Sequence, residues 1–327
     1  MKTFEFRHAT SVDDAVAGAA AGGTYFAGGT NLLDLMKGGV AQPTALVDLR
    51  RLGLTDITPT DEGGVFVGAG ASNSAVANHR LIRSQYPVVS HAILSGATTQ
   101  LRNMATAGGN LLQRTRCPYF MQTTFTSCNK RIPGSGCAAR GGFHREHAVF
   151  GASEECVATH PSDMAVALAI LDAVVHVQGP DGRRVVPIDG FFALPGDTPD
   201  VDNTLRPAEL ILGIELPPSR FADHSWYLKV RDRHSYAFAL VSVAAGLAME
   251  DGVIASAALA LGGVAPKPWR LHAAEAALVG RPADEAAFHA AAALAMDGAD
   301  PLPQNEFKVD LGRHAVVRAL TRAAAVE

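Results

Sequence analysis

Long apolar runs are absent from this sequence, and so is a large excess of charge of either sign. No segment approaches the roughly twenty apolar residues that span a bilayer, and residues 1–15 lack the apolar core of a signal peptide. The formal net charge of −4 argues against nucleic acid or an anionic membrane as a partner. With 48% hydrophobic and 18% charged residues, the chain is predicted to be soluble and globular, and its export would depend on a partner.

Cysteine is scarce as well, but its placement is informative. All four cysteines fall within residues 117–156, with the spacings C-x10-C, C-x8-C and C-x18-C. The close C-x2–4-C pairs that typify zinc sites are missing, and nothing else indicates the oxidising compartment that disulfides need. An iron–sulfur cluster takes four thiolates, including widely spaced ones, and is the favoured interpretation, with zinc, disulfides and chance left open. The four candidate ligands are Cys117, Cys128, Cys137 and Cys156. The nearby His144, His147 and His160 are expected to be solvated and not to bind metal.

No complete dinucleotide fingerprint and no hydrolytic triad is visible. Residues 68–73 read GAGASN, so Asn73 stands where the third glycine of G-x-G-x-x-G is required, and no βαβ unit is evident. These residues are therefore interpreted as a strand end followed by a helix start.

Two diglycine segments are the candidate anion-binding sites. A predicted strand at 24–26 runs into residues 27–31 (AGGTN) and then into a helical pattern at 32–37. Residues 106–110 (TAGGN) form a second diglycine turn just before the cysteines. Paired glycines let a phosphate approach the backbone, and a helix start favours negative charge. A plain tight turn is the simpler interpretation of each segment.

Two groups of charged residues are further candidates. Asp163, after Ser162, begins an apolar helical pattern at 164–171, so it is either a helix cap or a ribose-binding carboxylate. Lys229, with Arg231 and Arg233, forms a small positive cluster whose simpler interpretation is a solvated strand face.

Hydrophobic periodicity and turn residues predict an α+β protein. Strands are expected at 2–7, 24–26, 45–49, 54–58, 65–68, 173–178, 184–188, 210–216, 226–230, 237–249 and 254–261. Helices are expected at 12–19, 32–37, 74–94 with a new start at Pro87, 164–171, 268–278, 283–295 and 311–325. Residues 217–218 (Pro-Pro) stop a strand and mark the boundary to the last domain.

Taken together, these residues resemble the FAD-binding subunit of the molybdenum hydroxylases, the family of xanthine dehydrogenase and carbon monoxide dehydrogenase. The segment 27–31 is similar to the first flavin motif of that family, and 106–110 is similar to the second, T-x-G-G-N. Ser162-Asp163 matches its S-D pair, and Lys229 with Arg233 matches its K-x-x-x-R pattern. The resemblance covers essentially the whole chain.

One difference from ordinary family members narrows the resemblance to a subtype of the family. Ordinary members pass almost directly from T-x-G-G-N to the S-D pair, whereas here an insertion at 112–158 carries every cysteine. The flavin subunit of bacterial heterotrimeric aldehyde oxidoreductases is similar, with a [4Fe–4S] cluster in such an insertion. The segments 114–120, 128–131 and 133–137 closely resemble that subtype. The resemblance therefore favours a [4Fe–4S] cluster held by the four cysteines.

The resemblance also implies a fold and a cofactor site. Two α/β FAD-binding subdomains are expected at 1–55 and 56–220, the second with the insertion, followed by an α+β domain at 221–327 with a three-stranded meander and helices. Both diglycine segments would hold the FAD pyrophosphate through backbone N–H groups, Asp163 would bind ribose, Lys229 would lie near the flavin ring, and Ile211 would touch the ring edge. The implied FAD-binding residues are Ala27, Gly28, Gly29, Thr30, Asn31, Leu32, Leu33, Thr106, Gly108, Gly109, Asn110, Asp163, Ile211 and Lys229.

The implied function is electron transfer within a molybdenum-dependent aldehyde oxidoreductase. Electrons would pass from a large molybdenum-cofactor subunit and a small [2Fe–2S] subunit through FAD to an external acceptor, in a heterotrimer or a dimer of it. The chain itself has no residue assigned as catalytic. It would be cytoplasmic by its own sequence, and periplasmic if a signal-bearing partner exports the complex. Two alternatives stay open: a stand-alone FAD oxidase or dehydrogenase with structural zinc or a cysteine cluster, and a non-catalytic assembly module stabilised by zinc.

Overall fold

A small parallel sheet forms the first part of the chain in the computed structural model, which describes residues 1–325. Its strands are β1 (Glu5–His8), β3 (Ala45–Asp48) and β2 (Thr24–Phe26), in that order across the sheet. Helices α1 (Val12–Ala20) and α2 (Leu32–Lys37) connect them. The Ser11 hydroxyl caps α1 by accepting from the Asp14 N–H at 3.0 Å, as the sequence predicted. The predicted edge strand is confirmed, although it begins at Glu5.

A five-stranded sheet follows, and all its neighbouring strands are antiparallel. Its strands, in order, are β4 (Ile57–Pro59), β5 (Val65–Gly68), β8 (Leu210–Leu216), β6 (Val174–Gly179) and β7 (Gly182–Pro187). The helices of this part are α3 (Asn73–Asn78), α4 (Arg80–Gln85), α5 (Pro87–Ser95), α6 (Thr99–Met104), α7 (Ala107–Leu111) and α10 (Asp163–Ala169). A short 3-10 turn, η1, covers Ile188–Gly190. The predicted hairpin at 173–188 is confirmed by the pairing of β6 with β7.

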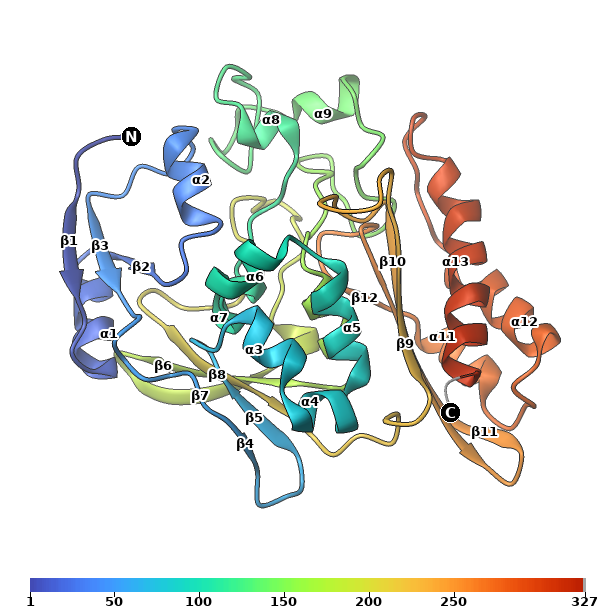
Figure 1. The fold of residues 1–327 in the computed structure, drawn as a ribbon. Helices are drawn as coiled ribbons and strands as arrows, with labels where there is room; N and C mark the ends of the chain where they lie inside the picture. Colours follow the sequence, from blue (N-terminus) through green and yellow to red (C-terminus); the bar gives the residue numbers. More distant parts are fainter. Residues whose placement is uncertain (326–327) are drawn as a thin grey trace.

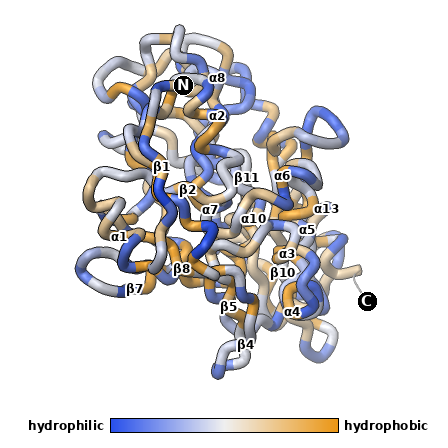
Figure 2. The backbone as a smooth tube through the Cα atoms, turned by 60° about the vertical axis from the view of Figure 1, so that its left-hand side comes forward, coloured by the Kyte–Doolittle hydropathy of each residue, from blue (hydrophilic) through white to orange (hydrophobic). Residues whose placement is uncertain are grey.

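Apolar side chains from this sheet and from its helices form one continuous core. In β6 buried and half-buried residues alternate, as expected for a strand with only one face in a core. The turn between β4 and β5 is hydrophilic and lies at the outside of the molecule (Figure 2).

The cysteine-bearing insertion is mostly irregular. Its short helices are α8 (Pro118–Met121) and α9 (Ala138–Gly141), which lie apart from the sheets at one end of the molecule (Figure 1). An isolated antiparallel bridge pairs Cys128 with Cys137. Long loops of this kind are usually ordered by something other than regular secondary structure.

The last part is an antiparallel sheet with helices. The strands, in order, are β12 (Trp269–Arg270), β11 (Val253–Gly262), β10 (Val241–Glu250) and β9 (Ser225–Val230), and the helices are α11 (His272–Leu278), α12 (Glu285–Ala295) and α13 (Phe307–Ala324). The three helices pack on one side of the sheet (Figure 1), while α5 and α10 contact the sheet from the central part of the chain.

Some predictions for this part were wrong in detail, among them the helix predicted from residue 311, which begins at Phe307. Residues 269–270, predicted as helix, form a fourth strand because Trp269 and Arg270 pair with Leu261 and Ala260. The strand predicted from residue 237 begins at Val241. Residues 326–327 of the predicted last domain lie outside the described residues. No helix within residues 1–325 is both long and apolar enough to cross a bilayer.

Candidate functional site

A cavity of about 750 Å³, called the large cavity below, lies where the three parts of the chain meet. Its volume falls within the range of pockets that bind small molecules and cofactors. Predicted residues that line it are Gly28, Gly29, Thr30, Asn31, Leu33, Gly109, Asn110, Asp163 and Lys229. The structure therefore brings both diglycine segments together with the predicted carboxylate and ammonium groups.

The other predicted residues do not line the large cavity. Ala27, Thr106 and Gly108 belong to the two diglycine segments, and Leu32 directly follows the first, but none of the four lines the cavity. Ile211 is buried in the core of the five-stranded sheet. The predicted contact between Ile211 and a flavin ring therefore finds no support in the arrangement.

The first diglycine segment presents free backbone donors. Within residues 1–325, no protein atom accepts a hydrogen bond from the N–H groups of Gly28, Gly29, Thr30 or Asn31. The segment leads into α2, whose first bonds run from the Leu33 N–H to the Gly29 carbonyl. Gly29 has φ +71°, a left-handed conformation that glycine adopts without strain. Successive free N–H groups at a turn are a typical anion-binding arrangement.

The second diglycine segment differs from the prediction. Residues 107–111 form the short helix α7, and its first N–H groups already have partners. Those of Ala107 and Gly108 donate to the carbonyls of Ala71 and Ala69 at 2.9 Å, and that of Gly109 donates to Thr106 Oγ1 at 3.2 Å. The Asn110 N–H likewise donates to the Thr106 carbonyl at 2.8 Å, so the expectation of free donors is not met at residues 107–110.

The glycines of the two segments serve different purposes. A Cβ on Gly28 would overlap the Met104 carbonyl, and a Cβ on Gly108 would lie 3.0 Å from Ala69 Cβ, so these two glycines permit close packing between segments. A Cβ on Gly109 would meet only Thr106 Oγ1, at 3.0 Å. Gly109 therefore offers bare backbone surface to the cavity.

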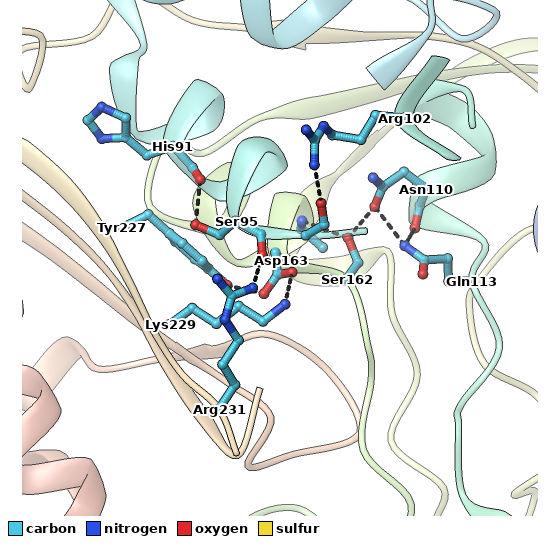
Figure 3. A network of polar contacts seen from close by, with 12 residues as sticks. His91, Ser95, Arg102, Asn110, Gln113, Ser162, Asp163, Tyr227, Lys229 and Arg231 are labelled. Carbon is cyan, nitrogen blue, oxygen red and sulfur yellow. Dashed lines mark hydrogen bonds and ion pairs between the residues drawn. The ribbon is translucent and has the colours of Figure 1, made fainter. Parts of the chain in front are cut away.

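Asp163 is held by two side chains from β9 (Figure 3). Its Oδ2 lies 2.7 Å from Lys229 Nζ, and its Oδ1 accepts from the Tyr227 hydroxyl at 2.7 Å. The Lys229 side chain is only 3% exposed, so the interpretation as a solvated strand face was wrong for Lys229, whereas Arg233 of the same cluster is exposed. Burial and then the Asp163 carboxylate raise the pKa of Tyr227 well above its usual value, so Tyr227 remains a donor.

Ser162, and not Asp163, is the residue that caps α10. The Ser162 hydroxyl accepts from the Ala165 N–H at 3.0 Å and donates to Asn110 Oδ1 at 2.6 Å. Capping by Ser162 leaves the Asp163 carboxylate free to face the large cavity.

A cavity-lining turn at residues 95–97 was missed by sequence reasoning. Arg231 donates to the Ser95 carbonyl at 2.6 Å, and Arg102 donates to the Gly96 carbonyl at 2.7 Å (Figure 3). Ala97 has φ 54°, which is uncommon for a non-glycine residue and is often found at functional sites. Arg231 belongs to the small positive cluster with Lys229 and Arg233, and Arg102 lies in the segment 100–102 (QLR), just before the second diglycine segment, so both carried a signal.

The four cysteines converge on one site, called the cysteine site below. All four are free thiols, and all four line the same small pocket. Burial raises the pKa of Cys117 to about 12 and also raises the pKa of Cys156. Thiolates in such a place need a positive partner such as a metal.

Within residues 1–325, no group of three or more Cys, His, Asp or Glu side chains is arranged to hold a metal ion. Disulfides are likewise not formed. The neighbouring histidines were predicted to be solvated, but His144 and His147 are buried, and His147 Nε2 lies 3.1 Å from Cys117 Sγ.

The sequence and the fold are similar to those of known proteins. Residues 2–219 match the family model for the FAD binding domain in molybdopterin dehydrogenase, and residues 226–323 match that for the CO dehydrogenase flavoprotein C-terminal domain. The chain is 48% identical to the aldehyde oxidoreductase FAD-binding subunit PaoB of Escherichia coli K12, with 99% of both chains covered. It is 26% identical to the carbon monoxide dehydrogenase medium chain of Afipia carboxidovorans, with 99% and 97% covered. A solved carbon monoxide dehydrogenase from Hydrogenophaga pseudoflava matches with a TM-score of 0.77 at 26% identity, with 99% and 98% covered.

Proposed function

The chain belongs to the family of FAD-binding subunits of the molybdenum hydroxylases, and from this premise we propose that it is the FAD- and [4Fe–4S]-containing electron-transfer subunit of a molybdenum-dependent aldehyde oxidoreductase. In this role it passes electrons from molybdenum and [2Fe–2S] subunits to an external acceptor. The supporting observation is the large cavity. Its lining combines the free backbone N–H groups of residues 28–31, the bare backbone of Gly109 and the Asp163 carboxylate with its partner Lys229.

The residues of the large cavity fit FAD. The free N–H groups of residues 28–31 suit the pyrophosphate, which needs donors and carries negative charge. Gly109 lets the diphosphate lie against the backbone of α7 without a side chain between them. A carboxylate has about four acceptor positions, so Asp163 can accept from ribose hydroxyls while it keeps Tyr227 and Lys229.

Bound FAD would supply the redox chemistry, while the protein orients it and sets the charge around it. Lys229 contributes through Asp163: the ammonium holds the carboxylate in place, so the two side chains act as one unit at the cavity wall. Arg102 and Arg231 fix the turn at 95–97, which limits the movement of that wall.

We propose that the cysteine site holds a [4Fe–4S] cluster. Four thiolates are the usual ligand set of such a cluster. Four free thiols that line one pocket support this proposal. Cys117, Cys128, Cys137 and Cys156 would be the ligands, and the cluster would supply a one-electron centre.

The partners and the substrate class are proposed from the relatives. The relative with 48% identity is named as an aldehyde oxidoreductase subunit, so we assign an aldehyde as the substrate of the complex. A large molybdenum-cofactor subunit would bind that aldehyde, and a small [2Fe–2S] subunit would connect it to this chain. The proposed domains are residues 1–55, 56–220 and 221–327.

Flavin, iron and zinc analysis of the purified chain tests the proposal. One FAD and about four iron atoms per chain are expected after anaerobic preparation. A colourless zinc protein would favour the assembly-module alternative, and turnover of an aldehyde or alcohol by the chain alone would favour a stand-alone oxidase.

A further inference from the structure

His147 connects the cysteine site to the last part of the chain. Its Nε2 lies 3.1 Å from Cys117 Sγ, and its side chain is buried. The His147 carbonyl accepts from Lys308 Nζ at 2.9 Å and from Asn305 Nδ2 at 3.1 Å. Lys308 also donates to the Gly263 carbonyl at 2.7 Å. The backbone of His147 is therefore held by Lys308 of α13 and by Asn305 just before that helix, while its buried ring lies against Cys117.

The direction of the contact between His147 and Cys117 follows from the chemistry of a metal-bound thiolate. Such a sulfur has no hydrogen and can only accept a hydrogen bond. The hydrogen between the two groups must therefore be carried by Nε2 of His147. The ring nitrogen Nδ1 then needs a partner of its own.

A cavity of about 40 Å³, called the small cavity, lies beside this ring. Its lining includes His147, Cys117, Arg116, Asp163 and Ser242. Within residues 1–325, His147 Nδ1, Arg116 Nη1 and Ser242 Oγ are buried and have no hydrogen-bond partner in the protein. A polar cavity needs about 10–15 Å³ to hold one water, which must find several polar partners. The small cavity is large enough for one water, and three residues on its lining carry the unpartnered polar atoms named above.

We propose that His147 is a positioning residue for the cluster: its Nε2–H donates to the Cys117 thiolate, and water in the small cavity gives Nδ1 its partner. This inference rests on the proposed cluster at the cysteine site. Hydrogen bonds to the sulfur ligands are among the factors that set the reduction potential of an iron–sulfur cluster. A donor stabilises the more negative, reduced form, so His147 raises the reduction potential.

The test is a redox titration of the full chain, monitored by visible absorption and EPR, with iron counted in every sample. His147→Phe keeps a ring but removes the donor, and the midpoint potential of the cluster should move to a lower value while the iron content stays at the wild-type level. His147→Gln keeps an N–H donor and should restore part of the difference. His144→Gln is the matched control, because His144 is also buried in the insertion but contacts Ala139 and Gln304 and no sulfur. The midpoint potential of the cluster in His144→Gln should equal that of the wild type.

A second measurement uses the wild-type protein and does not depend on the folding of a variant. Protein labelled with ¹⁵N-histidine should show a ¹⁵N coupling to the reduced cluster in pulsed EPR. The inference is overturned by an unshifted potential in His147→Phe, or by the absence of ¹⁵N coupling in a protein that holds its cluster. Absence of iron from the wild type would contradict the proposed cluster instead, so the two failures are distinguishable.

Discussion

Lys229 and Asp163 form a buried ion pair in which Nζ lies 2.7 Å from Oδ2. The pair joins β9 of the last sheet to the first turn of α10 in the central part of the chain. The wall of the large cavity is thus held together by an electrostatic contact between segments that are distant in sequence. Removing either charge should disturb both the folding of this wall and the binding of FAD.

Lys229→Met should destabilise the chain by about 3 kcal/mol, because it leaves a buried carboxylate without its cation. Its affinity for FAD should fall at least about tenfold, equivalent to about 1.4 kcal/mol. Urea unfolding and FAD titration measure the two effects. Lys267→Met is the control, since Lys267 pairs with the exposed Asp189 and a surface pair is worth at most about 1 kcal/mol. Equal stability of the two variants would contradict the assigned role of Lys229.

Gly109→Val should lower FAD affinity about 100-fold or more by placing a branched side chain where the diphosphate is proposed to lie, a loss of about 2.7 kcal/mol. The fold should survive, because a Cβ at this position meets only Thr106 Oγ1 within the protein. Fluorescence titration with FAD provides the measurement. Gly190→Val is a matched control at a position where a Cβ meets nothing within 4 Å. An unchanged FAD affinity in Gly109→Val would remove α7 from the proposed site.

Cys128→Ser should lose most of the bound iron while it retains FAD. A serine hydroxyl is a poor ligand for iron in a cluster that is held by thiolates, and Cys128 does not line the large cavity. Iron and FAD analysis of the same sample gives the content of each cofactor per chain. Thr124→Ser, an exposed change in the same loop, should retain both cofactors. Retention of the full iron complement by Cys128→Ser would show that this residue is not a ligand.

Acid should destabilise the first sheet through Asp48, the last residue of β3. Burial opposes ionisation of Asp48, but hydrogen bonds from Arg50 and His8 outweigh it and lower the pKa from 3.8 to about 2. Because the pKa of Asp48 is lower in the folded chain than in the unfolded chain, ionised Asp48 contributes its full stabilisation of the fold above about pH 4. That contribution to the unfolding free energy is lost as the pH falls from about 4 to 2. The loss amounts to about 2 kcal/mol.

Asp48→Asn tests this pH dependence. Its unfolding free energy should be lower than that of the wild type above pH 4, and the difference between the two proteins should shrink as the pH falls toward 2. Denaturant unfolding at several pH values measures it, with the exposed Asp61→Asn as control. A constant difference across that range would show that Asp48 is not responsible.

Local signals allowed much of the fold to be predicted from the sequence. The hairpin of β6 and β7 follows from its turn residues, and α1 follows from the Ser11 cap. The strand β12 could not be predicted, because Trp269 and Arg270 become a strand only by pairing with β11. Tertiary contacts override local preference in such short segments.

The residues of the candidate site could be predicted from the sequence, but their hydrogen-bond and ion-pair partners could not. The diglycine segments and Asp163 were found from their motifs. The free donors are the N–H groups of residues 28–31 in the first segment, whereas those of residues 107–110 in the second have protein partners. At the second segment, the carbonyls of Ala69 and Ala71 occupy the N–H groups, and these acceptors belong to a remote part of the chain. The Lys229–Asp163 pair and the burial of His147 depend in the same way on packing between segments, which periodicity does not report.

The central claim is that the large cavity binds FAD, and an equilibrium titration of the flavin-depleted full chain with FAD tests it most directly. The account predicts saturable quenching of flavin fluorescence with one FAD bound per chain, and much weaker binding by Gly109→Val and Lys229→Met. Absence of saturable binding by the folded wild-type chain, or equal binding by all three proteins, would contradict it.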